Sequence, residues 1–87
     1  MSPSEIRDAL DAVPFQSFRL VVSSGNHYDV DDPHFVLVAN RYVHIGIPAT
    51  PGDPFPDRII RLDLLHVTEL VPLTHPPQAQ GNGQPAE

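Results

Sequence analysis

Prolines divide this chain into short pieces, and this feature limits its fold more than any other. The sequence holds 11 prolines among 87 residues, and most of them stand between runs of patterned apolar residues. A proline lacks a backbone N–H and disfavours helical conformation in the preceding residue, so it ends helices and is excluded from the middle of a sheet. We therefore expect short elements, packed as one domain over residues 1–74.

The first piece predicts a helix of about three turns. Ser2 and Glu5 match a capping box, with Pro3 at the first helical position, where its missing N–H costs nothing. Pro14 ends the helix. One apolar stripe follows at helical spacing: Ile6, Ala9, Leu10 and Val13. A helix this short is not stable alone, so the stripe must dock on the rest of the fold.

Residues 18–31 predict a β-hairpin. Apolar and polar residues alternate on both sides of the turn cluster Ser23–Asn26. A two-residue loop would put Tyr28 on the wrong face, whereas a three-residue loop over 24–26 keeps the apolar residues of both strands together. The pairs are then Val22 with Tyr28 and Leu20 with Val30.

Residues 35–47 predict a second hairpin, with Asn40 and Arg41 as a two-residue loop. The face that we interpret as core pairs Val38 with Val43 and Val36 with Ile45. The other face pairs Ala39 with Tyr42 and Leu37 with His44.

The remaining residues predict a loop, a strand, a turn and a last strand. Residues 48–56 hold four prolines and a glycine, which indicates a loop outside any sheet. Ile60 and Leu62 face inward from a strand, residues 63–66 form a short helical turn, and a last strand covers 67–71. Residues 75–87 have no aliphatic side chain larger than alanine and no aromatic one, so we expect a disordered tail.

This order of elements predicts a mainly β (α+β) fold: an N-terminal helix, then a strongly bent five-stranded antiparallel sheet or a small barrel. At the level of element order it resembles the SH3-like and Sm-like barrels. Over residues 4–72 the chain also resembles a group of short bacterial proteins of unassigned function. The segments that carry this resemblance are 14–20, the hairpin with Gly25, Asp32-Pro33-His34-Phe35 and Asp63-Leu64-Leu65-His66-Val67. The resemblance implies a fold and no activity.

Charge argues against nucleic acid as a partner. The chain has five arginines, no lysine and 11 acidic residues, for a net charge of −6. Nucleic-acid binding depends on cationic side chains that displace counterions from phosphates. Arg41, Arg58 and Arg61 still leave an Sm-like nucleic-acid-binding protein as the alternative. No apolar run approaches the roughly 20 residues that a membrane helix needs, and no leader pattern is present, so we expect a soluble cytoplasmic protein without membrane contact.

Catalytic and metal-binding patterns are missing from the sequence. The five histidines never recur at i, i+2 or i, i+4, and there is no cysteine, so we expect no metal and no cofactor. Asp29, Asp31 and Asp32 are interpreted as a solvated strand end followed by a turn. A domain this small also leaves little room for a pocket of roughly 300 Å³ or more. We therefore expect no enzyme, with a small-ligand or metal-responsive regulator as a weaker alternative.

The outward side of the second hairpin carries the main functional prediction. Phe35, Leu37, Tyr42 and His44 point away from the predicted core, and an apolar strip on a small domain is typical of a partner or subunit contact. The sequence leaves open whether the N-terminal helix covers this strip. We predict a non-enzymatic protein-interaction or self-assembly module, which binds a protein partner or a second copy through this strip or through an exposed strand edge.

Overall fold

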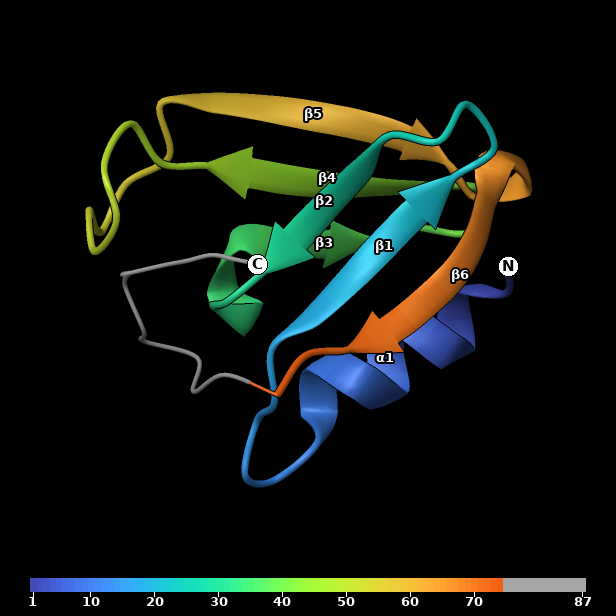
Figure 1. Cartoon of the computed structure of the whole chain (residues 1–87), viewed down its shortest axis with the longest axis horizontal. Coiled ribbons are helices and arrows are strands. Elements are labelled where there is room, and N and C mark those ends of the chain that lie inside the picture. The colour runs from blue at the N-terminus through green and yellow to red at the C-terminus, as the bar shows by residue number, and fades with distance from the viewer. Residues whose placement is uncertain (75–87) are drawn as a thin grey trace.

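The computed structural model describes residues 1–74, which form one helix and six strands (Figure 1). The predicted disordered tail, residues 75–87, lies outside the described residues. The elements are α1 (Pro3–Asp11), β1 (Phe18–Val22), β2 (His27–Val30), β3 (Val36–Val38), β4 (Tyr42–Ile47), β5 (Arg58–Asp63) and β6 (Val67–Pro72), with 3₁₀ turns η1 (Pro33–Phe35) and η2 (Leu64–His66). Within this part of the chain, no helix is long and apolar enough to cross a membrane.

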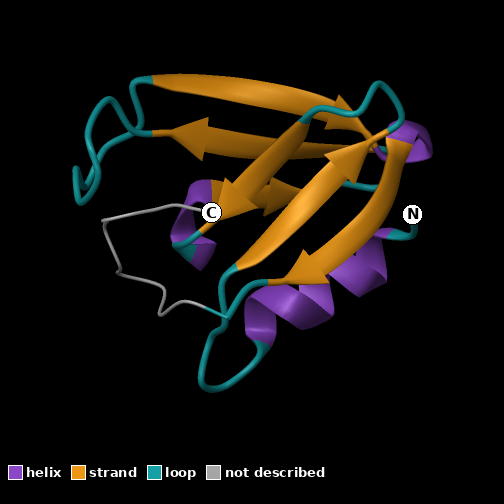
Figure 2. Ribbon diagram, in the orientation of Figure 1, coloured by secondary structure: helices purple, strands orange, loops and turns teal. Residues whose placement is uncertain are grey.

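The strands form two antiparallel sheets of three strands each, in the orders β2–β1–β6 and β3–β4–β5. Figure 2 shows them as two separate layers that cross at an angle. The mainly β class with one N-terminal helix is confirmed. The predicted five-stranded sheet or small barrel is wrong, because there are six strands and the two sheets do not join into one.

The two 3₁₀ turns explain why the sheets stay separate. The chain passes from the first sheet to the second through η1 and returns through η2. Asp32 Oδ1 accepts the backbone N–H of His34 at 2.9 Å, and Asp63 Oδ1 accepts that of Leu65 at 2.9 Å. Each aspartate thus caps a turn that takes the backbone out of one hydrogen-bonded ladder and starts it in another.

The first hairpin has a loop of the predicted length at a different place. Gly25 donates to the carbonyl of Val22 at 2.8 Å, and Val22 donates to Asn26 at 3.0 Å, so the loop is residues 23–25. Gly25 has φ +97°, which a glycine adopts readily at the third loop position. The predicted pairs are therefore wrong by two residues, although the faces are right. Leu20 lies opposite Tyr28, and Phe18 lies opposite Val30.

The second hairpin has the predicted register. Val36 pairs with Ile45, Leu37 with His44 and Val38 with Val43. The predicted strand is too long at its start, because Phe35 belongs to η1. Strand β5, turn η2 and strand β6 lie where the sequence predicted them.

Helix α1 closes the core between the sheets. It begins after Ser2, whose N–H donates to Glu5 Oε1 at 3.1 Å, as the capping box predicts. It ends at Asp11, so Val13 lies beyond the helix and is 95% exposed rather than part of the stripe. Figure 1 shows α1 beside β6, and the helix also contacts β3. The buried core draws on α1, both sheets and η2: Ile6, Leu10, Phe18, Leu20, Val30, Val43, Ile45, Leu64 and Val67.

Candidate functional site

The outer face of the β3–β4–β5 sheet holds three of the four predicted interaction residues. Side chains directly opposite one another in antiparallel strands share a face, so the register defines this surface. Leu37 lies opposite His44, and His44 lies opposite Arg61. We call this surface the outer face. It comprises Leu37, Tyr42, His44, Gly46, Ile59, Arg61 and Asp63.

Two aliphatic residues of the outer face reach solvent. Leu37 is 64% exposed and Ile59 is 67% exposed. Tyr42 and His44, on the central strand β4, are half-buried, and His44 lies between Leu37 on β3 and Arg61 on β5. The Arg61 guanidinium lies 4.6 Å from the centre of the Tyr42 ring, a cation–π contact that covers the ring with a charged group. Helix α1 leaves Leu37 uncovered, so the question that the sequence left open is answered for this residue.

Pro56 closes one end of the outer face over Gly46. A Cβ atom at Gly46 would lie 2.9 Å from the Cβ of Pro56 and 3.5 Å from the carbonyl oxygen of Phe35. No side chain fits at the first distance without displacing the proline, so glycine is required here by space rather than by φ. The exposed residues of the outer face are Leu37, Ile59 and Arg61.

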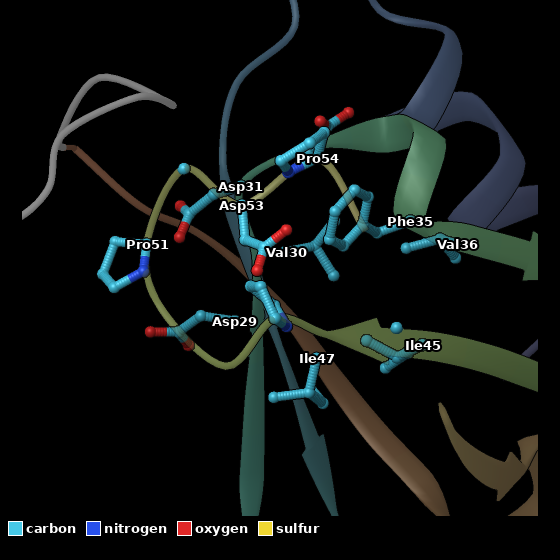
Figure 3. Close-up of a pocket in the computed structure, with 14 residues that line it drawn as sticks. Asp29, Val30, Asp31, Phe35, Val36, Ile45, Ile47, Pro51, Asp53 and Pro54 are labelled. Atoms are coloured by element: carbon cyan, nitrogen blue, oxygen red, sulfur yellow. The ribbon is translucent and has the colours of Figure 1, made fainter. Parts of the chain in front are cut away.

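Phe35, the fourth predicted interaction residue, lies elsewhere. Because η1 turns the chain before β3 begins, Phe35 leaves the strand alternation and its side chain lines a pocket (Figure 3). The alternation rule fails here because Pro33 cannot extend the strand and Asp32 caps a turn instead. The prediction that Phe35 shares a face with Leu37 and Tyr42 is not what the register shows.

The pocket has a volume of about 530 Å³ and lies between the end of β2, the end of β4 and the loop after it. The expectation of too little room for such a pocket is wrong, because the proline-rich loop stands out from the sheets and adds a wall. Figure 3 shows Phe35, Val36 and Ile45 on one side and Asp29 and Asp31 beside Pro51 on the other. The lining residues are Asp29, Val30, Asp31, Asp32, Phe35, Val36, Ile45, Gly46, Ile47, Pro48, Pro51, Gly52, Asp53 and Pro54.

The loop that forms this wall is held by backbone hydrogen bonds. At its ends, the Asp57 N–H donates to the carbonyl of Ile47 at 2.8 Å. At its tip, the Asp53 N–H donates to the carbonyl of Thr50 at 3.2 Å, and Gly52 has φ +87°, which together with Pro51 defines a type II turn. Three prolines among the lining residues further restrict the backbone, so the wall is formed before any ligand arrives.

Four aspartates belong to the pocket lining, which contains no arginine, lysine or histidine. Arg19 neutralises one of them, with Nε and Nη2 at 2.7 and 3.1 Å from the two oxygens of Asp29. His34 Nδ1 lies 3.1 Å from Asp32 Oδ1 just outside the lining. Asp53 Oδ1 accepts the N–H of Phe55 at 3.0 Å. The pocket therefore combines an apolar floor with a negatively charged rim.

Sequence reasoning missed this pocket because its parts were interpreted separately. The sequence indicates a solvated strand end at Asp29–Asp32 and a loop outside any sheet at residues 48–56, and neither pattern by itself points to a pocket. The available signal was the position of Val30, Ile45 and Ile47: inward-facing residues at strand ends, next to a loop rich in rigid residues.

The carboxylates of the pocket do not converge. Over residues 1–74, no three His, Cys, Asp or Glu side chains lie close enough together to hold a metal ion. Comparison of the chain with protein-family models, with curated proteins and with solved structures gives no match. The functional argument therefore rests on the outer face and on the pocket.

Proposed function

We propose that this protein is a non-enzymatic self-assembly module whose outer face packs on the same face of a second copy. The observation that supports it is the exposure of Leu37 and Ile59 on adjoining parts of one sheet face, uncovered by α1. Exposed aliphatic side chains on a structured surface gain free energy when a second surface removes them from water. A domain of this size buries a smaller fraction of its unfolded surface than a larger domain does, so it gains stability from association.

The charges of the outer face favour a second copy over an unrelated partner. The whole chain has a net charge of −6, which opposes association of two copies unless the surfaces in contact carry charges of both signs. On the outer face, Arg61 and Asp63 are two residues apart on β5 and have opposite charges. A two-fold axis that passes between these two residues sets Arg61 of one copy against Asp63 of the other, so the face can be complementary to itself about that axis.

Light scattering coupled to size exclusion, over a series of protein concentrations, tests this proposal. The mass is expected to rise with concentration from the 9.6 kDa of one chain toward twice that value. Leu37→Asp and Ile59→Asp each place a charge in the contact, and each is expected to raise the dimer Kd about tenfold or more.

Val13→Asp supplies the matched control, because Val13 is 95% exposed and lies outside the outer face. It adds the same charge and removes a similar apolar side chain, so the dimer Kd should change less than about twofold. A protein that stays monomeric at the highest concentration reached, or a Val13→Asp effect as large as that of Leu37→Asp, would contradict the proposal.

A further inference from the structure

We infer that the pocket between β2, β4 and the proline-rich loop binds a small organic cation, an ammonium or guanidinium group on an apolar stem. The pocket and the outer face share Gly46, but Leu37, Ile59 and Tyr42 do not line the pocket, so substitutions at those three positions distinguish the two sites. Its ligand class follows from the volume, the lining and the charge of the pocket.

The volume and floor of the pocket fit a whole small molecule. At about 530 Å³ it falls within the roughly 300–1,000 Å³ of typical small-molecule sites. Val30 and Ile45 are buried at its base, while Phe35 and Ile47 are half-buried and offer apolar contact area. An apolar stem that displaces water from these side chains gains the usual hydrophobic free energy.

The rim selects for positive charge. Asp31, Asp32 and Asp53 join Asp29 on the lining, and Arg19 lies on Asp29 at the outer side of the strand pair. The lining itself carries four carboxylates and no basic side chain, so its formal charge is negative, and the Arg19 guanidinium offsets only part of it. An ammonium group is attracted by this field, whereas a carboxylate is repelled by it.

The spacing of the carboxylates favours an organic cation over a metal ion. A metal needs several oxygen ligands at about 2.0–2.6 Å around one point. In the described part of the chain no three acidic or histidine side chains are grouped in that way. Dispersed carboxylates around an apolar floor instead match a ligand with a charged end and an apolar body.

The pocket is rigid enough for this role. The Ile47–Asp57 hydrogen bond and the type II turn at Pro51 and Gly52 already fix the loop. A ligand therefore orders little backbone when it binds, and less of its binding free energy is lost to conformational entropy.

Three ligands of nearly equal size test the inference: 2-phenylethylamine, 2-phenylethanol and phenylacetate. Each is titrated into the full-length protein at low salt and followed by amide chemical shifts. The amine is expected to shift the amides of Asp29–Asp32, Ile45–Ile47 and Asp53, and to bind at least about fivefold more tightly than the alcohol. Phenylacetate should bind least, and added salt should narrow the difference between amine and alcohol.

The double variant Asp32→Asn/Asp53→Asn removes two charges from the rim and keeps each Oδ1 acceptor that caps a turn. It should weaken binding of the amine about tenfold and leave the alcohol nearly unchanged. The matched control is Asp8→Asn/Asp11→Asn on α1, which makes the same change in net charge outside the pocket and should alter the amine Kd less than about twofold.

Equal binding of amine and alcohol would overturn the assignment of a cation, and shifts that map elsewhere would overturn the site. Absence of any shift with the amine would overturn the whole inference. Leu37→Asp should bind the amine as the unmodified chain does, because Leu37 does not line the pocket. A failure of self-assembly therefore leaves this test intact.

Discussion

Ser17 is fully buried, and its hydroxyl has no hydrogen-bond partner within residues 1–74. Its backbone is well used, because its carbonyl accepts the N–H of Leu73 at 2.9 Å and so ties the residue after β6 to the start of β1. A buried hydroxyl without a partner costs about 1–3 kcal/mol relative to its state in water. The Ser17 hydroxyl therefore destabilises the folded state, whereas the Ser17 carbonyl stabilises the sheet.

Replacing Ser17 with alanine is expected to raise the free energy of unfolding by about 1 kcal/mol, because the unpaired hydroxyl disappears and the backbone hydrogen bond stays. Urea denaturation of the two proteins measures the difference. Ser23→Ala, at an exposed loop position, is the control and should change stability by less than about 0.5 kcal/mol. Loss of stability in Ser17→Ala would mean that the hydroxyl is paired after all.

Two 3₁₀ turns with similar sequences, η1 and η2, connect the two sheets. Asp32-Pro33-His34-Phe35-Val36 and Asp63-Leu64-Leu65-His66-Val67 each place an aspartate before a 3₁₀ turn and a valine after it. In each turn the valine N–H donates to the first turn residue, Pro33 or Leu64. The aspartates therefore decide where one sheet ends and the other begins.

The cap at η2 predicts different effects for two substitutions of Asp63. Asp63→Ala removes the acceptor of the Leu65 N–H and should lower the free energy of unfolding by about 1 kcal/mol, whereas Asp63→Asn keeps Oδ1 and should cost only a few tenths. Thermal and urea unfolding of both variants, at concentrations where the protein is monomeric, provide the measurement. Equal losses in the two variants would show that charge, and not the cap, matters at this position.

The hairpins were predictable from the sequence, but the contacts made by the turns and loops that connect them were not. The two-residue loop at Asn40 and Arg41 fixed the register of β3 with β4, because a loop of that length sets which flanking residues pair. In the first hairpin, a shift of the strand register by two residues keeps every side chain on its face, so the apolar pattern is compatible with both registers. Only the preference of Gly25 for positive φ distinguishes the two registers.

The accuracy of the predicted site residues depended on whether they lie inside a hairpin or in a connecting segment. Leu37, Tyr42 and His44 were placed correctly because they lie inside a strand pair. Phe35 was misplaced because it precedes the strand, and the pocket was missed because it needs β2, β4 and the loop together. Contacts between elements far apart in the sequence leave no periodic signal.

At the scale of the molecule, one core serves both sheets and the helix. Ile6 of α1 is completely buried among residues of the two sheets, including Leu20 and Val43. Neither sheet has a second hydrophobic cluster of its own in the described residues. The two sheets and α1 are therefore expected to unfold together.

Ile6→Ala is expected to lower the free energy of unfolding by about 2–4 kcal/mol through the cavity that it leaves. Signals from β1 and from β4 should be lost at the same denaturant concentration, as measured by amide resonances alongside circular dichroism. Val13→Ala, at a 95% exposed position, should stay within about 0.5 kcal/mol of the unmodified chain. Separate transitions for the two sheets would contradict a shared core.

The hydrogen bond between Ile47 and Asp57 joins backbone atoms only, so it holds the ends of the loop whatever side chains stand between them. Substitutions at exposed tip positions such as Ala49 and Pro51 then reshape the rim while the strands keep their places. The scaffold and the proline-rich loop can therefore diverge separately, and chains descended from one ancestor can come to differ at the rim of this pocket at little cost to folding.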